Sequence, residues 1–169
     1  SVGEIRLPIK DKYDHTTNMI TNTEVSYSYH HNAYGGYASY FNSDSSYNKC
    51  WRSYCLDYNI KGLNLAFSYL YTIKNIDGSG FGDRIELFLQ PGVSYWWYDL
   101  KLSDSLQEYS ESISSMGALF QSKISISMTK NSFLYFMYGV RSENIESKKF
   151  RFKVKGLSTE SKLGVGYEF

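Results

Sequence analysis

The sequence has very little proline or cysteine, no long apolar run and almost no net charge. Two of its 169 residues are Pro and two are Cys. A membrane-spanning helix needs about 18 consecutive apolar residues, and no segment of the chain reaches that length. The formal net charge of +1 provides no basic footprint for nucleic acid. If the chain crosses a membrane, it must therefore do so with strands.

Aromatic residues are abundant, and tyrosine dominates among them. They make up 18% of the chain, with 17 Tyr against 10 Phe and 3 Trp. A buried tyrosine needs a partner for its hydroxyl group, so an excess of Tyr is unusual in a soluble core. Tyr and Trp instead form belts where a protein surface meets both lipid and water. A Tyr-rich soluble β-sandwich is the alternative interpretation.

Alternation of apolar and polar residues is found along most of the chain and predicts strands. The predicted strands are 3–10, 20–30, 34–41, 52–60, 63–74, 84–90, 93–102, 118–128, 132–144 and 157–169. Short turns near residues 31, 61, 91 and 130 alternate with long connections at 11–18, 42–50, 75–83, 103–115 and 145–156. The turns at 61 and 91 are predicted from Lys61-Gly62 and Pro91-Gly92, and 145–156 is either a loop or a hairpin arm above the membrane. This alternation is typical of membrane barrels with short periplasmic turns and longer external loops.

The last thirteen residues, Leu157 to Phe169, read LSTESKLGVGYEF. One face of this strand is increasingly apolar, and the other carries Glu, Lys and Gly. The segment resembles the closing strand of bacterial outer-membrane β-barrels, in which a C-terminal Phe belongs to the assembly signal. The resemblance implies an outer-membrane location in contact with lipid and lipopolysaccharide. The start at Ser1 suggests a mature form whose secretion signal has been removed, although a truncated chain would look the same.

The predicted fold is a single all-β domain over residues 1–169, an antiparallel transmembrane β-barrel of ten strands, with eight or twelve as alternatives. The polar face is mostly Ser, Asn, Gly, Ala and Gln, which suits a crowded lumen, so we place the apolar face in lipid. The main rival is a soluble lipocalin-type barrel. The opening from Glu4 through Tyr13-Asp14-His15 to Tyr37 is also similar to that of the oligogalacturonate-specific porins, which are monomeric barrels.

Charges of both signs are predicted to face the lumen. They are Arg6, Glu24, Asp57, Arg84, Glu86, Lys123, Glu160, Lys162 and Glu168. These side chains either form a salt-bridged network that fills the interior or line a narrow conduit that selects solutes. Barrels of about eight strands are filled by side chains, and those of sixteen to eighteen are open, so a filled or very narrow lumen is expected.

Candidate sites outside the lumen are few. A basic stretch contains Lys148, Lys149, Arg151, Lys153 and Lys155, and it either borders lipopolysaccharide or binds an acidic saccharide or host polyanion. Cys50 and Cys55 are expected to form a disulfide if residues 51–54 make a turn, and otherwise remain free thiols.

The histidines do not suggest catalysis. His15 follows Asp14, and His30 and His31 lie at a short turn. The Asp14-His15 pair could serve as a general base, but no nucleophile or oxyanion partner accompanies it, so we expect these two residues to be solvated surface groups. The sequence indicates no catalytic residue, no metal site and no cofactor.

Three functions are compatible with these features. The first is a narrow, monomeric, porin-like channel for small polar solutes or saccharides. The second is a non-conducting barrel that acts as an adhesin or assembly partner through loops 42–50, 103–115 and 145–156. The third is a lipid-modifying outer-membrane enzyme using His15 or Asp14.

Overall fold

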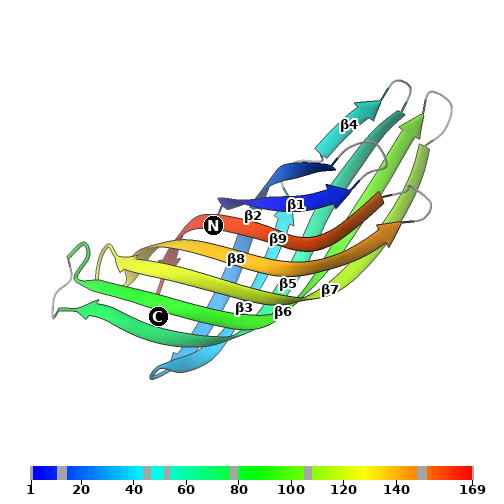
Figure 1. Ribbon diagram of the computed structural model, residues 1–169. Helices are drawn as coiled ribbons and strands as arrows, with labels where there is room; N and C mark the ends of the chain where they lie inside the picture. Colours follow the sequence, from blue (N-terminus) through cyan, green and yellow to red (C-terminus); the bar gives the residue numbers. More distant parts are fainter. Residues whose placement is uncertain are drawn as a thin grey trace.

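The computed structural model describes a barrel of antiparallel strands (Figure 1). It describes residues 2–10, 15–43, 47–51, 54–76, 80–104, 108–147 and 152–168, with side chains at 2, 21–43, 59–76, 80–101, 109–142, 144–147 and 154–168. The strands are β1 (Val2–Lys10), β2 (His15–His31), β3 (Tyr34–Ser43), β4 (Tyr47–Trp51), β5 (Tyr54–Asn75), β6 (Arg84–Asp104), β7 (Glu108–Ser127), β8 (Ser132–Ser147) and β9 (Phe152–Tyr167). No helix within these ranges is long and apolar enough to cross a membrane.

Eight of the nine described strands close the barrel, so the prediction of ten strands is wrong. Each strand pairs antiparallel with its neighbours, and β3 pairs with β5 to complete the ring. The short strand β4 pairs with β5 and adds to the sheet beyond the ring. The predicted turns at Lys61-Gly62 and Pro91-Gly92 do not exist, because both dipeptides lie inside single long strands. Without these two turns, the ten predicted strands become eight.

The register sets the inclination of the strands. Following paired residues once around the barrel from Thr21 leads back to His31 of the same strand, a stagger of ten residues. With about 3.3 Å per residue and about 4.8 Å between strands, this stagger corresponds to a tilt of roughly 40°. An eight-stranded barrel of this kind has an interior just wide enough for side chains.

The two ends of the barrel differ. One end, the turn end, carries the two-residue turn Asn32–Ala33, the connection after Asn75 and the turn after Ser127. The connection after Asn75, predicted as an external loop, therefore lies with the short turns; its Gly82 N–H donates to Ser127 O at 2.9 Å. At the other end, the hairpin end, strands run far past the closed ring, and most of the expected loops 103–115 and 145–156 are strand. The expectation of a hairpin arm at 145–156 is confirmed.

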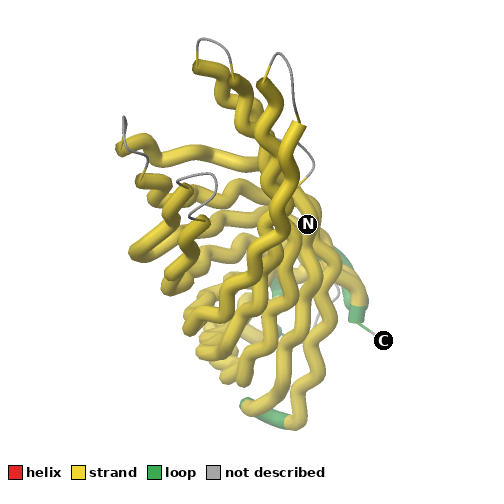
Figure 2. Tube along the Cα trace, turned by 90° about the vertical axis from the view of Figure 1, so that its right-hand side faces the viewer, coloured by secondary structure: helices red, strands yellow, loops and turns green. Residues whose placement is uncertain are grey.

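The hairpin end divides into two four-stranded arms. The first arm is β4-β5-β6-β7 and the second is β2-β1-β9-β8. They separate because pairing of β7 with β8 ends at Leu119–Arg141, and pairing of β2 with β3 ends at Asn22–Ser43. Figure 2 shows the β4–β5 and β6–β7 hairpins running together, apart from the β1–β2 and β8–β9 hairpins.

The apolar face of each long strand changes sides between barrel and arm. On β5, Leu63, Leu65 and Phe67 point outward and are exposed, whereas Ile60 in the arm points inward and is fully buried. The same change occurs between Trp97 and Tyr98 on β6 and between Leu157 and Val154 on β9. A strand in lipid places its apolar face outward, and a strand in water buries it, so a change of this kind is expected where a strand passes from lipid into water.

This change of face explains the false turn at Lys61-Gly62. A one-residue shift in alternation normally indicates a break between two strands. Here β5 is continuous, and the shift arises because its apolar residues lie on the inward face in the arm and on the outward face in the barrel. Gly62 is needed for packing: a Cβ added there would lie 2.3 Å from Cε1 of Phe41 and 2.5 Å from Cδ1 of Trp96.

Pro91 lies in the middle of β6, where sequence rules place a turn. It points outward and is exposed, and it pairs with Phe120 on β7. On the other side, the β5–β6 ladder is interrupted between the pairs Ala66–Gly92 and Tyr69–Leu89. Because proline has no N–H to donate, it interrupts a ladder without ending the strand.

Candidate functional site: a filled lumen and two surface arms

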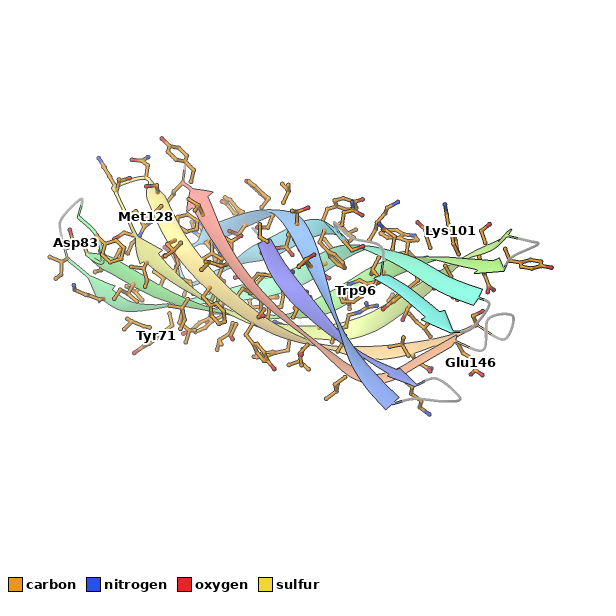
Figure 3. The ribbon with its side chains drawn as sticks, turned by 90° about the horizontal axis from the view of Figure 1, so that it is seen from above. Tyr71, Asp83, Trp96, Lys101, Met128 and Glu146 are labelled. Carbon is orange, nitrogen blue, oxygen red and sulfur yellow. The ribbon has the colours of Figure 1, made fainter. Side chains whose placement is uncertain are left out.

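Buried side chains fill the described part of the lumen from the turn end to the arms, and Figure 3 shows the side chains along the barrel. Trp96, labelled there, lies inside the barrel between the turn end, marked by Asp83 and Met128, and the arms, marked by Lys101 and Glu146. Tyr71 projects outward from β5. The predicted orientation, with polar residues inside and apolar residues outside, is therefore confirmed for the described side chains between the turn end and the change of face, and it is wrong for the arms, where the apolar side chains point inward.

The middle of the lumen holds a buried ion cluster. The Lys162 ammonium group, on β9, contacts a carboxylate oxygen of Glu24 on β2 and lies 3.0 Å from Oε2 of Glu160. Tyr37 donates its hydroxyl to Oε1 of Glu24 at 2.7 Å, and Gln121 donates its amide to Glu160. All five side chains are buried. Three predicted lumen charges are thus brought into one network in which each is paired with an opposite charge, as buried charges require.

An aromatic layer covers this cluster on the hairpin side. The Arg141 guanidinium group stacks on the Trp96 ring at 3.9 Å and donates to Ser115 O at 3.0 Å. Phe41 meets Trp96 edge-on at 4.8 Å between ring centroids, and the Trp96 indole N–H points to Oδ1 of Asn64 at 3.4 Å. Beyond this layer, Ile60, Tyr98, Leu100, Ile145 and Val154 are buried between the arms. The lumen is therefore closed by apolar packing as well as by charge.

A second cation closes the turn side of the cluster. The Lys123 ammonium group lies 4.1 Å from the Phe88 ring centroid and 5.5 Å from that of Tyr135, an arrangement that favours a desolvated cation. His30 lies against Phe88 at 5.1 Å and contacts Ser68 Oγ at 2.8 Å. Ser68 is fully buried, so this His–Ser contact is a packing interaction inside the wall.

The remaining predicted lumen charges lie at the turn-end rim or outside the described side chains. Arg84 contacts Glu168, and its Nε lies 3.6 Å from Oε1 of Glu86. This rim cluster is partly exposed, unlike the central one. The side chains of Arg6 and Asp57 lie outside the described residues, so their roles stay predictions.

The other predicted sites are described only in part. Lys155 is exposed on β9, whereas Lys148, Lys149, Arg151 and the side chain of Lys153 lie outside the described residues. The register pairs Cys50 of β4 with Cys55 of β5 across a turn, as a disulfide would need, but their side chains are not among those described. Asp14 and the side chain of His15 also fall outside the described part. Within the described ranges, no group of His, Cys, Asp and Glu could hold a metal ion.

Sequence reasoning missed Trp96 and Arg141, which close the lumen. The run Tyr95-Trp96-Trp97-Tyr98 gave no preferred face, because both of its faces are aromatic. The alternation of side chains along a strand would have placed Arg141 inside, since Phe136, Tyr138 and Val140 point outward and Arg141 follows at the next, inward position.

Comparisons with known proteins identify the fold. No protein-family model matches the chain, and no curated protein sequence matches it. Among solved structures, Neisserial surface protein A matches at a TM-score of 0.65 and 15% identity, covering 99% of this chain and 94% of that one. Ail, the attachment invasion locus protein of Yersinia pestis, matches at 0.55 and 18%, covering 99% and 95%. Ail in complex with the heparin analogue sucrose octasulfate also matches, at 0.59 and 16%, covering 99% and 95%.

A third neighbour is the N-terminal β-barrel domain of Pseudomonas aeruginosa OprF, at a TM-score of 0.55 and 12% identity, covering 99% of this chain and 96% of that one. All are bacterial proteins of the outer-membrane β-barrel class, and at these identities the likeness shows the fold alone. The similarity to oligogalacturonate-specific porins is not shown by these comparisons.

Proposed function

We propose that this chain is a non-conducting barrel of the bacterial outer membrane whose two arms bind a partner at the cell surface. The observation that carries the proposal is the filled lumen. A solute would have to displace the Lys162–Glu24 pair, the Arg141–Trp96 stack and the apolar layer beyond them. The channel hypothesis therefore has less support than the binding hypothesis.

The outer wall supports placement of the barrel in a membrane. On β5 the outward residues from Leu63 to Ile73 are apolar or aromatic. At roughly 3.3 Å per residue and a tilt of about 40°, this stretch spans about 25 Å, the height of the apolar band of outer-membrane barrels. Tyr95 and Trp97 lie next to the Lys61–Asp99 ion pair, on its turn-end side, as expected at a lipid–water boundary.

The arms supply the binding surface. Seven residues of β5 and of β6 extend beyond the change of face, roughly 20 Å of strand if fully extended. Such a rigid two-sheet projection is a costly feature for a protein that only fills the bilayer. Two neighbours are named as a surface protein and an attachment invasion locus protein, which is compatible with this role.

A sulfated or otherwise acidic saccharide is a second candidate ligand. The basic stretch Lys148, Lys149, Arg151, Lys153 and Lys155 runs, in the sequence, from just after the last residue of β8 into the first residues of β9. The neighbour Ail has been solved with a heparin analogue, which makes a sulfated sugar the sensible first probe. Replacing Lys153 and Lys155 together with Gln should weaken retention on heparin resin, and unchanged retention would exclude this site.

Planar-bilayer recordings test the central proposal. The folded protein, verified by heat-modifiable migration on gels, should add no discrete current steps. Two shortened variants then test which arm binds. In the first arm, 101–110 is replaced with Asn-Gly, and in the second arm, 146–153 is replaced with Asn-Gly. Binding to target cells should fall in at least one variant while both still migrate as folded barrels. Reproducible single-channel currents from the intact protein would overturn the proposal.

A further inference from the structure

The first arm has an open strand edge on β7. The β7–β8 ladder ends at Leu119–Arg141, although β7 continues in register with β6 as far as Glu108. Within the described residues, the stretch Glu108–Ala118 therefore has a strand neighbour on one side only. The facing stretch of β8, Ser142–Ser147, forms its described ladder with β9, and it reaches β7 here through side chains, with Ser147 Oγ donating to the Glu111 carboxylate.

The separation of β7 from β8 is built into the sequence. A Cβ added to Gly117 would lie 2.1 Å from the carbonyl oxygen of Ser142, so β8 crosses close to the inward side of β7 at this point. The Ala118 N–H donates to Ser142 Oγ at 3.0 Å, where a continuous ladder would use a backbone carbonyl. Side-chain bonds thus end the ladder, and β8 leaves the sheet of the first arm.

The hydrogen-bonding groups on this edge can be assigned. The N–H of Ala118 points toward β8, away from β6. Because backbone groups in a strand alternate between its two sides, the N–H and C=O groups of Ser110, Ser112, Ser114 and Met116 point to the same open side. The side chains of all four are exposed.

The edge lacks most of the features that normally prevent strand addition. Natural edge strands are protected by charged side chains, especially Lys, by Pro, by bulges or by a short length, and of these 108–118 carries only the charges of Glu108 and Glu111. The stretch 108–118 is eleven residues long and contains neither Lys nor Pro. Its four serines are small, so they leave the backbone accessible.

Charge indicates which strand would pair there. Every ionisable side chain in 108–118 and 142–147 other than Tyr109 is a glutamate: Glu108, Glu111, Glu143 and Glu146. The basic residues of the described strands lie one strand further away, with Lys101 opposite Ser110, Lys153 opposite Glu146 and Lys155 opposite Asn144, while Arg141 is held on Trp96. Lys148, Lys149 and Arg151 lie outside the described residues. A second copy of β7 would place glutamates beside glutamates, which is unfavourable.

We infer that the open edge of β7 binds an extended polypeptide segment carrying Lys or Arg, which adds to the first arm as a further strand. Backbone hydrogen bonds would supply affinity, and the glutamates would select for basic side chains. The inference rests on the proposed function, since it requires that the arms lie outside the membrane.

The test uses the intact protein in lipid nanodiscs and a fluorescent ten-residue peptide of alternating Thr and Lys. Binding should be measurable by anisotropy and should protect the amides of residues 110–116 from hydrogen exchange. A Thr–Glu peptide of the same length should bind more weakly. The Thr–Lys peptide with every second backbone nitrogen methylated should not bind, because it can no longer form a ladder.

The matched variants are Ser114→Pro and Ser114→Thr. Proline removes one N–H on the open side and leaves the β6–β7 ladder intact, so affinity should fall about tenfold. Threonine keeps the N–H and should bind as the parent does. Equal binding by Ser114→Pro, or by the methylated peptide, would overturn the edge site. If the protein dimerised without peptide and Ser114→Pro abolished that dimer, the inferred peptide site would be overturned, and the edge of β7 would instead pair with a second copy of this chain. Cell binding that survives Ser114→Pro would leave the proposed function standing without this site.

Discussion

Lys162 and Glu24 form a fully buried ion pair in the middle of the barrel, although they are 138 residues apart in the sequence. Removing the cation alone would leave Glu24 and Glu160 as buried charges close together. We expect Lys162→Met to lower the free energy of unfolding by about 3–5 kcal/mol. Urea unfolding from lipid vesicles, followed by tryptophan fluorescence, measures this change.

The control for this pair removes both charges. Lys162→Met combined with Glu24→Gln leaves one carboxylate in place of two and should recover a large part of the lost stability. If the single and double variants were equally stable, the pair would not be a coupled element of the core.

Gly62 and Gly36 make a matched pair of strand glycines. At Gly62 an added Cβ meets the rings of Phe41 and Trp96 inside the lumen, and at Gly36 it meets nothing within 4 Å. Gly62→Ala should destabilise the barrel by about 1–3 kcal/mol through overpacking. Gly36→Ala should be neutral or stabilise it by up to about 1 kcal/mol. The same urea assay distinguishes the two, and a tolerated Gly62→Ala would mean that the aromatic layer is loosely packed.

The rim pair Arg84–Glu168 should contribute far less than the central pair. The Glu168 side chain is 54% exposed, so water and salt screen the interaction. Glu168→Gln should cost less than about 1 kcal/mol, partly because the backbone N–H of Glu168 still donates to Asn131 O at 2.8 Å. The loss should shrink further in high salt. A penalty as large as that of Lys162→Met would show that the C-terminal strand depends on this contact.

The register of Cys50 and Cys55 predicts a disulfide across the β4–β5 hairpin. Protein refolded under oxidising conditions should react with a maleimide only after reduction, visible as a shift on a gel. Because the closed loop has six residues, the chain-entropy model gives a stabilisation of about 2 kcal/mol. Labelling of both thiols without reductant would show that they are free.

Several features were predictable because they depend only on local alternation. The strands of β1, β2 and β3, the outward face of β9 and the inward positions of Glu24, Glu160 and Lys162 follow from a period of two. These predictions needed no knowledge of neighbouring strands. The turns at Lys61-Gly62 and Pro91-Gly92 were wrong for a shared reason: local turn signals were stronger than the evidence for a continuous strand.

The sequence by itself determined that this chain forms antiparallel strands with one apolar and one polar face, because alternation is a property of consecutive residues. Only the tertiary structure decided how many strands form the barrel and which side chains fill its lumen. Closure of β3 onto β5, the meeting of Lys162 with Glu24 and the stacking of Arg141 on Trp96 join residues from distant strands. The exchange of apolar faces along β5 depends on where the strand leaves the closed ring for the arm, and that position belongs to the assembled barrel.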